Sequence, residues 1–341
     1  MPLRTSLYSV RAMSTTIKDI ADRLNISYAT VSRALNGRYG VNPRTREKVL
    51  AAAKKLHYTP NAVARGLVTR QTMTLGLIIP DITNPFFPWV ARGVEDRAAE
   101  AGYSILLCNT NWDKKREERY LSLFKEKRVD GIILAPVSPG EKRAGKRAGL
   151  PLVYMSDTRR DSNISSVTID NVLGGYTAVS YLITMGYKRI GFFGAVEDEL
   201  TSAERYQGYR KALDEAGRPN YDRYVRYGDY RNTTGSHLIN SMISEGDYPD
   251  AVFAVNDLFA LGVIQGVKEA GLSVPGDVAV VGFDDIPFAS FPEVMLTTMA
   301  QPKYEMGRMA VDLLLEEIDG PARHRGREIV LEPELIIRRT A

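Results

Sequence analysis

The pattern of apolar and polar positions changes near residue 73. Before it, apolar residues recur every three or four positions over short stretches, which is typical of small amphipathic helices. After it, short apolar runs alternate with longer segments of helical periodicity, which indicates strands alternating with helices. A chain of 341 residues is expected to form two or three domains at about 150 residues each. We place the first boundary at this change of pattern.

The segment from Thr16 to Leu35 predicts two short helices joined by a tight turn. Thr16 is a suitable N-cap, and Asp19 three residues later completes a capping box. Asn25 lies where the chain must turn sharply, and Asn tolerates the left-handed conformation. Ser27 can cap the second helix, which ends before Asn36-Gly37. This helix-turn-helix layout places a second helix in the major groove of DNA.

A third helix is predicted to complete a headpiece spanning residues 14–60. Asn42 can cap it, and Pro43 suits its first position because no N–H is needed there. Its predicted buried stripe consists of Val49, Leu50, Ala53 and Leu56. Three such helices bury just enough apolar surface for the headpiece to fold.

The second helix carries the candidate base-reading side chains. The forked guanidinium of Arg33 matches the O6/N7 edge of guanine, while Tyr28 and Ala29 are expected to face base edges. Tyr28 could instead pack on its own helix. The remaining polar side chains would hold phosphates and set the register. The candidate DNA-binding residues of the headpiece are Thr16, Ser27, Tyr28, Ala29, Thr30, Ser32 and Arg33.

Residues 61–73 form a candidate hinge segment. Pro60 to Leu67 could form a helix of about eight residues, which is too short to be stable alone in water, and Gly66 weakens it further. We therefore expect it to be helical only when docked. Leu67 suits an apolar wedge between base steps in the minor groove, and a plain linker leucine is the alternative.

The body predicts two α/β lobes. The predicted strands of the first series are 74–79, 103–110, 129–136 and 150–155, and those of the second are 189–194, 251–255 and 278–285. Helices are expected at 84–101 and 114–127 and from Ala203 and Asp257 onward. Strands that alternate with helices favour parallel, Rossmann-like sheets, and ligands bind at the carboxyl ends of such strands. Two lobes that face each other by these ends would form a cleft.

Polar and aromatic residues follow several of these strands. Carboxylates, amides and Arg can hold a neutral polyol by planar hydrogen bonds, while an aromatic face packs on its C–H side. The candidate effector-binding residues are Asp81, Phe86, Phe87, Asp157, Arg205, Asn256 and Asp284. Asn84 and Asp257 are interpreted instead as helix caps.

Charge separates the headpiece from the body. The whole chain carries a net charge of +4. Residues 1–73 hold 13 Lys and Arg against 3 Asp and Glu, a net of +10, so the remainder carries −6. A basic head on an acidic body indicates that the head meets a polyanion.

The sequence predicts a cytoplasmic protein with no membrane partner. No apolar run approaches the ~20 residues of a membrane span, and the first residues lack the apolar core of a secretory signal. A start site assigned too far upstream of Met13 is one hypothesis for residues 1–12. The single Cys108 excludes an intrachain disulfide, which agrees with a reducing compartment.

Enzyme classes find little support. Gly140 to Lys146 fits G-x-x-x-x-G-K, but Arg147 replaces the Ser or Thr that binds Mg²⁺, and no strand precedes the motif. Neither a dinucleotide fingerprint nor a nucleophile elbow is present. The three His residues are scattered along the chain, so a zinc site is not expected. We predict no catalytic residues, no metal and no cofactor.

The segments TIKDIADRLNISYATVSRALNG and VNPRTREKVLAAAKKLHYTPNAVARGL resemble the headpiece and hinge of the lactose repressor (LacI) family. The resemblance implies a homodimer whose paired hinge helices lie in the minor groove of double-stranded operator DNA. Leu67 would be the intercalating residue, with Ala64 beside it, and Asn61 of the same segment is a further DNA-binding candidate. It also places Tyr28, Ala29 and Arg33 in the major groove.

The body resembles the same family, whose core is similar to periplasmic sugar-binding proteins. PDITNPFF, TIDNVLGG, ERYQGYRKAL, VNDLFALG, VVGFDD and ELIIRRT carry this resemblance. It implies three crossovers, with one lobe made of 74–172 and 301–329 and the other of 173–300 and 330–341. Pocket positions map onto Phe86, Phe87, Arg205, Asn256 and Asp284. Many members carry Asp where this chain has Ser156, and Asp157 could substitute by a shift of register.

Together these features predict a ligand-controlled transcriptional regulator. We expect a repressor that binds a pseudo-palindromic operator as a dimer and responds to a sugar or sugar derivative between its lobes. Inducer and corepressor both fit, and a tetramer stays open although no heptad tail follows Arg339. The competing interpretation is a sugar-binding module without DNA function, which would need an export signal and would have no use for the basic head.

Overall fold

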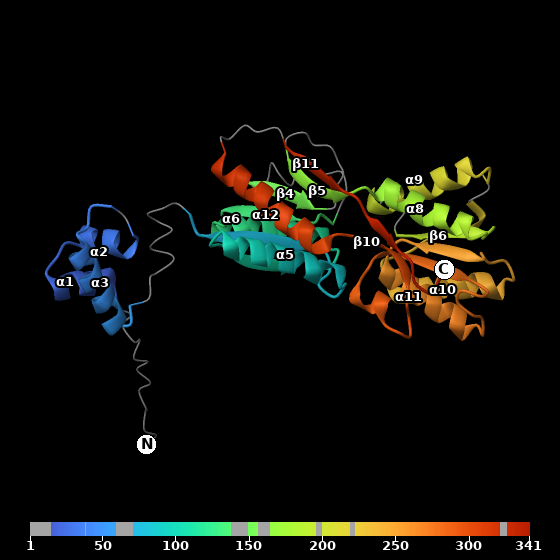
Figure 1. Cartoon of the computed structure of the whole chain (residues 1–341), viewed down its shortest axis with the longest axis horizontal. Helices are drawn as coiled ribbons and strands as arrows, with labels where there is room; N and C mark the ends of the chain where they lie inside the picture. The colour runs from blue at the N-terminus through green and yellow to red at the C-terminus, as the bar shows by residue number, and fades with distance from the viewer. Residues whose placement is uncertain are drawn as a thin grey trace, which may run out of the picture. The chain divides into compact units, whose positions relative to one another are not determined.

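The chain forms two compact units, residues 1–72 and 73–341 (Figure 1). The computed structural model describes residues 15–37, 39–58, 71–137, 149–155, 164–195, 200–218, 222–320 and 326–341. The candidate residues Asn61, Ala64, Leu67 and Asp157 lie outside these ranges. No helix among the described residues has the length and apolar character of a membrane span.

The headpiece consists of α1 (Ile17–Leu24), α2 (Tyr28–Leu35) and α3 (Pro43–Lys55). The capping box is confirmed, because the Thr16 N–H donates to Asp19 Oδ2 at 2.7 Å and the Thr16 side chain accepts from the Asp19 N–H. Asn25 adopts the expected left-handed conformation, with φ of 50°. Ser27 and Asn42 cap α2 and α3 as predicted, accepting from the N–H groups of Thr30 and Arg44. Local signals alone therefore set the ends of these helices.

The headpiece core differs from the prediction at one position. Ile20, Val31 and Val49 are fully buried at its centre. Leu50 is 49% exposed, so its predicted burial is wrong, and Ala52 is buried instead. At about 100° per residue, Val49, Ala52 and Ala53 share one side of α3, and Leu50 lies beyond the edge of that side.

The first lobe is built on a six-stranded parallel sheet. Its strands are β1 (Thr74–Ile79), β2 (Ser104–Asn109), β3 (Gly131–Leu134), β4 (Leu152–Met155), β5 (Ser165–Ile169) and β11 (Glu328–Leu331), in the order β11-β5-β4-β3-β1-β2. Helices α5 (Phe86–Glu100) and α12 (Lys303–Asp319) lie side by side against one face, and α6 (Lys114–Lys127) covers the other (Figure 1). Side chains alternate accordingly: Leu77 packs in the α5 side of the core and Ile78 in the α6 side, with Phe124.

The second lobe repeats this plan. Its strands are β6 (Ile190–Gly194), β7 (Val225–Tyr227), β8 (Ala251–Ala254), β9 (Ala279–Asp284), β10 (Thr297–Ala300) and β12 (Glu334–Ile336), in the order β12-β10-β9-β8-β6-β7. Only the β10–β12 pair is antiparallel among these. Its helices are α8 (Asn171–Thr184), α9 (Leu200–Glu215), α10 (Asn232–Ser244) and α11 (Asp257–Glu269), with 3-10 turns at Asp222–Tyr224 and Pro287–Ser290.

The chain crosses between the two lobes three times. The crossovers follow β5, β10 and β11, at Asp170, at Gln301–Pro302 and at Glu332–Pro333. β11 pairs with β5 through Leu331, two residues beyond the expected end of the first lobe at 329. The strands at 165–169, 225–227, 297–300, 328–331 and 334–336 and the helices α8 and α10 were not predicted from periodicity.

Glycines bring pairs of helices into backbone contact in each lobe. A Cβ on Gly93 of α5 would lie 2.1 Å from the carbonyl oxygen of Tyr304 in α12. A Cβ on Gly208 of α9 would lie 2.2 Å from the carbonyl oxygen of Val172 in α8. Real Cβ atoms cannot approach so closely, so both contacts require glycine. The second contact matters for function, because α8 and α9 carry Asn171 and Arg205.

Replacing Gly208 by Ala should destabilise the body. Helix propensity favours Ala by about 1 kcal/mol, but a methyl group forced against backbone typically costs about 1–3 kcal/mol. We expect a net loss of up to about 2 kcal/mol in the free energy of unfolding, measured by urea denaturation. Gln207→Ala, at the neighbouring exposed position of α9, is the matched control. A Gly208→Ala protein as stable as the parent would show that the helices can separate at no cost.

Candidate functional site

The exposed face of α2 presents the predicted base-reading residues. Tyr28 is 52% exposed, and Ala29 and Arg33 are also exposed, whereas Val31 and Ala34 on the opposite face are buried. This face therefore offers one guanidinium, one phenol and one methyl group to a partner. The spacing agrees with a recognition helix whose N-terminal residues reach base edges.

Several of the other polar candidates are engaged in helix caps. The hydroxyl groups of Ser27 and Thr30 lie 2.8 Å apart, and Ser27 Oγ accepts from the Thr30 N–H. Asn36 Nδ2 donates to the Ser32 carbonyl oxygen at 2.9 Å. Ser27 and Thr30 order the N-terminus of α2, where N–H groups favour anions such as phosphate, while Ser32 and Asn36 order its C-terminal end.

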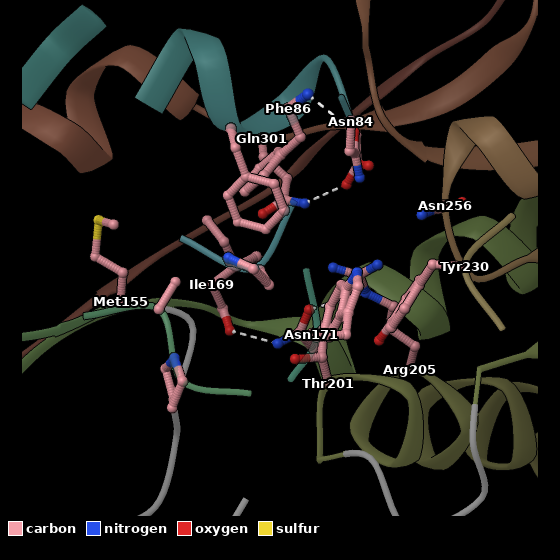
Figure 2. Close-up of a pocket in the computed structure, with 16 residues that line it drawn as sticks. Asn84, Phe86, Met155, Ile169, Asn171, Thr201, Arg205, Tyr230, Asn256 and Gln301 are labelled. Carbon is pink, nitrogen blue, oxygen red and sulfur yellow. Dashed lines mark hydrogen bonds between the residues drawn. The ribbon is translucent and has the colours of Figure 1, made fainter. Parts of the chain in front are cut away.

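A cleft lies at the carboxyl ends of the parallel strands of both lobes. Figure 2 shows Asn84 and Phe86 on one side of it and Asn171, Thr201 and Arg205 on the other. The lining residues are Pro80, Asn84, Phe86, Phe87, Trp112, Ala135, Pro136, Met155, Ile169, Asn171, Thr201, Arg205, Tyr230, Asn256, Asp284 and Gln301. Five of the predicted effector residues, Phe86, Phe87, Arg205, Asn256 and Asp284, are among them.

Asp81 does not line the cleft. Its carboxylate accepts from the Thr83 N–H at 2.9 Å and from the Thr83 hydroxyl at 2.6 Å, so it closes the turn that leads into α5. An Asp followed two residues later by Thr can form this turn locally, so the position of Asp81 after β1 has a local structural explanation.

Arg205 is the only Arg among the cleft residues, and it is almost fully buried. Its Nε donates to Asn171 Oδ1 at 3.0 Å, and its Nη1 donates to the Val255 carbonyl oxygen. The guanidinium lies 3.6 Å from the centroid of the Phe283 ring, a cation–π contact. These contacts hold the guanidinium in one orientation before any ligand arrives.

Asp284 provides the carboxylate of the cleft lining. Gln301 Nε2, from a crossover, donates to Asp284 Oδ1 at 2.6 Å. Burial raises the pKa of Asp284 to about 6, while the charges of Arg205 and Lys303 oppose this rise. Asp284 and Asp285 both have positive φ, 121° and 54°, and the Lys303 ammonium donates to the carbonyl oxygens of both. Lys303 thus ties the end of β9 to the crossover.

Asn256, predicted as a ligand, is the residue that caps α11, and Asp257, interpreted as a cap, is not. Asn256 Oδ1 accepts from the Phe259 N–H at 2.8 Å, so Asn256 caps α11 and also lines the cleft. Asp257 accepts from the Ile286 N–H and the Thr298 hydroxyl, at 2.8 and 2.5 Å, and joins α11 to the second sheet. Burial and the nearby Asp284 raise the pKa of Asp257 well above its ordinary value. Asn84, interpreted as a cap, accepts from the Phe86 N–H and lines the cleft as well.

Sequence reasoning did not select several lining residues. Trp112, Asn171, Thr201, Tyr230 and Gln301 all line the cleft. Tyr230 follows the three-residue β7, which is too short for a periodicity to reveal, and Gln301 lies in a crossover. Trp112 had a usable signal, since it lies two residues after the predicted strand 103–110, and Asn171 lies within the family-like segment TIDNVLGG.

Comparison with known proteins assigns both units. A profile described as "Bacterial regulatory proteins, lacI family" matches residues 16–61, and one described as "Periplasmic binding proteins and sugar binding domain of LacI family" matches residues 72–337. The chain belongs to the LacI family. It is 39% identical to catabolite control protein A of Priestia megaterium over 89% of this chain and 92% of that protein. It is 38% identical to the ribose operon repressor of Escherichia coli K12 over 96% of this chain and 99% of that protein.

Solved structures agree with this assignment. The lac repressor dimer bound to operator and the anti-inducer ONPF is similar with a TM-score of 0.85 at 26% identity, covering 96% of this chain and 99% of that one. The transcriptional regulator CelR–cellobiose complex is similar with a TM-score of 0.73 at 32% identity, covering 96% of this chain and 100% of that one. This LacI-family protein is therefore a DNA-binding transcriptional regulator and not an enzyme, as the sequence predicted.

The buried carboxyl of Asp284 predicts a pH dependence of stability. Between pH 3.8 and about 6 the folded protein holds this proton more tightly than the unfolded chain does. The stability that the protonated group contributes is therefore full below pH 3.8 and is lost as the pH rises through about 6. Asp284→Asn, which is neutral throughout, should flatten this fall, as measured by unfolding temperatures across the range. Glu126→Gln, at an exposed position of α6, is the control and should show the same dependence of unfolding temperature on pH as the parent. An unchanged slope in Asp284→Asn would contradict the prediction.

Proposed function

We propose that this LacI-family protein is a repressor that binds a pseudo-palindromic operator as a homodimer. In this proposal a sugar or sugar derivative binds in the cleft between the lobes and controls operator binding. The observation that carries the proposal is the composition of the cleft, in which one guanidinium, one carboxylate and several amides surround an aromatic wall. Its lining comes from both lobes, so a bound molecule would contact both.

The chemistry of the lining favours a neutral, hydroxyl-rich molecule. Arg205 can donate and Asp284, when ionised, can accept, while the amides of Asn84 and Asn256 can do either. Phe86 and Phe87 meet edge to face, with ring centroids 5.1 Å apart, and supply an apolar surface for a sugar's C–H face. The balance of one cation and one carboxylate suits a ligand without net charge. Two relatives, a ribose operon repressor and the regulator in a CelR–cellobiose complex, support this class.

The DNA partner is supported by the headpiece and by the relatives. The helix-turn-helix match at 16–61, the exposed face of α2 and the net charge of +10 over residues 1–73 all favour contact with a duplex. The lac repressor is a dimer on operator in its structure, which supports the same assembly here. A regulator of this kind acts where the DNA is, which favours the cytoplasm.

Control would operate through the residues that join the two units. Closing the lobes would change the separation of the two first lobes in the dimer, and hence whether the hinge segment, 61–73, can form paired helices on the minor groove. A few kcal/mol of differential affinity between two states suffice to move such an equilibrium. A sugar-binding module without DNA function would leave the headpiece unexplained.

Arg33→Ala should weaken binding to the operator and relax its specificity. Loss of one bidentate contact with guanine typically costs about 1–3 kcal/mol. The operator would be selected from a random DNA library with the parent protein, and affinities measured by fluorescence anisotropy at fixed salt. Lys54→Ala, which removes one charge from the exposed side of α3, should weaken operator and random DNA equally. Equal losses on both DNAs for Arg33→Ala would remove Arg33 from base reading.

Arg205→Lys should abolish the effector response while operator binding stays. Lysine keeps the charge but cannot form the planar fork of hydrogen bonds, so we expect an affinity loss of about tenfold or more. A panel of neutral sugars that begins with cellobiose and D-ribose would be screened by calorimetry and by its effect on operator binding. Arg210→Lys, on the exposed side of the same helix, is the control. An unaltered response in Arg205→Lys would exclude this guanidinium from ligand recognition, and a panel with no active sugar would count against the proposed effector class.

A further inference from the structure

Two aromatic side chains from different lobes stack on each other at the cleft. Trp112 follows β2 in the first lobe, and Tyr230 follows β7 in the second. Their ring centroids lie 5.0 Å apart, and the ring planes are inclined by only 16°. Both residues line the cleft. The pair therefore connects the lobes by a direct non-covalent contact, in addition to the three covalent crossovers.

The first-lobe partner is held in a strained conformation. Asn111 and Trp112 both have positive φ, 53° and 59°, which is rare for a side chain as bulky as Trp. The backbone N–H of Trp112 donates to the Pro80 carbonyl oxygen at 3.2 Å. The next residue, Asp113, caps α6, because its carboxylate accepts from the backbone N–H of Lys115 at 2.7 Å. Such strain persists only where the surroundings enforce it, and it concentrates at functional sites.

The second-lobe partner is equally well fixed. Asp229 Oδ1 accepts from the Arg231 N–H and the Thr234 hydroxyl, at 3.2 and 2.5 Å, which shapes the turn before α10. The Tyr230 ring packs against the core cluster of α10 and α11. Because the Trp112 backbone is tied to Pro80 and Tyr230 packs on the core of its own lobe, the stack depends on the relative position of the lobes.

The geometry also decides where a ligand can bind. Stacked rings whose centroids are 5.0 Å apart are already in contact, so no third ring fits between them. A ligand must bind beside the pair, within the cleft that the pair adjoins.

We propose that Trp112 and Tyr230 form an interlobe latch that favours the closed arrangement of the lobes and so sets the response of the regulator. This inference rests on the proposed function, and it makes both residues positioning residues for the effector site. A stacked aromatic pair contributes roughly two- to tenfold to an equilibrium constant. Loss of either ring should shift the balance of closed and open lobes by about that factor.

The stack itself can be tested without any ligand or DNA. The chain holds two Trp residues, Trp89 and Trp112, so Trp89→Phe leaves Trp112 as the only indole reporter. In that full-length protein, Tyr230→Ala should shift the emission to longer wavelength and raise the acrylamide quenching constant about twofold or more. Tyr230→Phe should keep the parent emission, because the ring remains. Phe291→Ala, which removes an exposed aromatic of the same lobe outside the cleft lining, is the control.

The latch function is tested by a double-mutant cycle on operator affinity. Trp112→Ala and Tyr230→Ala should each change the affinity in the same direction by about two- to tenfold, and the double variant should change it no further, since one contact is lost in all three. Trp112→Phe, which keeps an aromatic ring, should have the operator affinity of the parent. The latch would be overturned if Tyr230→Ala left the emission of Trp112 unchanged. It would also be overturned if the effects of the two substitutions on operator affinity were additive. A parent protein that binds no operator would refute the proposed function instead, while the fluorescence result would still show whether the stack exists.

Discussion

The cleft depends on one constraint, that charges buried at the end of the second sheet must be paired. Arg205 and Asp284 are both almost fully buried, and an isolated charge in such a place would cost several kcal/mol. The structure meets this requirement with an amide, a carbonyl oxygen and an aromatic face for Arg205, and with an amide from a crossover for Asp284. Satisfying these groups also fixes their direction. The same contacts that make the burial tolerable therefore preorganise the polar side of the cleft.

This network joins parts of the chain that lie far apart in sequence. Gln301 and Lys303 follow β10, yet both bond to residues at the end of β9, and Asp257 of α11 bonds to Thr298 of β10. The crossover is thus part of the site and more than a connection. Within each lobe, glycine contacts hold pairs of helices at backbone distance. The lobes are consequently stiff bodies, and relative movement is expected at the crossovers and at the Trp112–Tyr230 contact, where a ligand shared by both lobes would act.

Sequence reasoning succeeded where the signal is local. The caps at Thr16, Ser27 and Asn42 and the whole of α6 were predicted correctly, because capping residues and helical periodicity act within a few positions. It failed at Leu50, where the partner helices decide which apolar residues of α3 are buried. At Asp81 it did not foresee the turn with Thr83, and the residue is not part of the cleft lining. The strands β7, β10, β11 and β12 contain only three or four residues, and β-sheet pairing from distant partners, more than their own composition, defines them.

What the sequence by itself determined is the identity of the parts: a basic three-helix headpiece, two α/β lobes, and the residue types that follow their strands. These depend on periodicity, capping and charge, which are local properties. Only the tertiary structure decided which strand-end residues converge. It separated Asp81 from Asp284, gave Asn256 both a capping and a lining position, and brought Trp112 against Tyr230 from 118 residues away. The reason is physical, since convergence depends on sheet order and crossovers, and those are settled by the burial of whole faces rather than by any short segment.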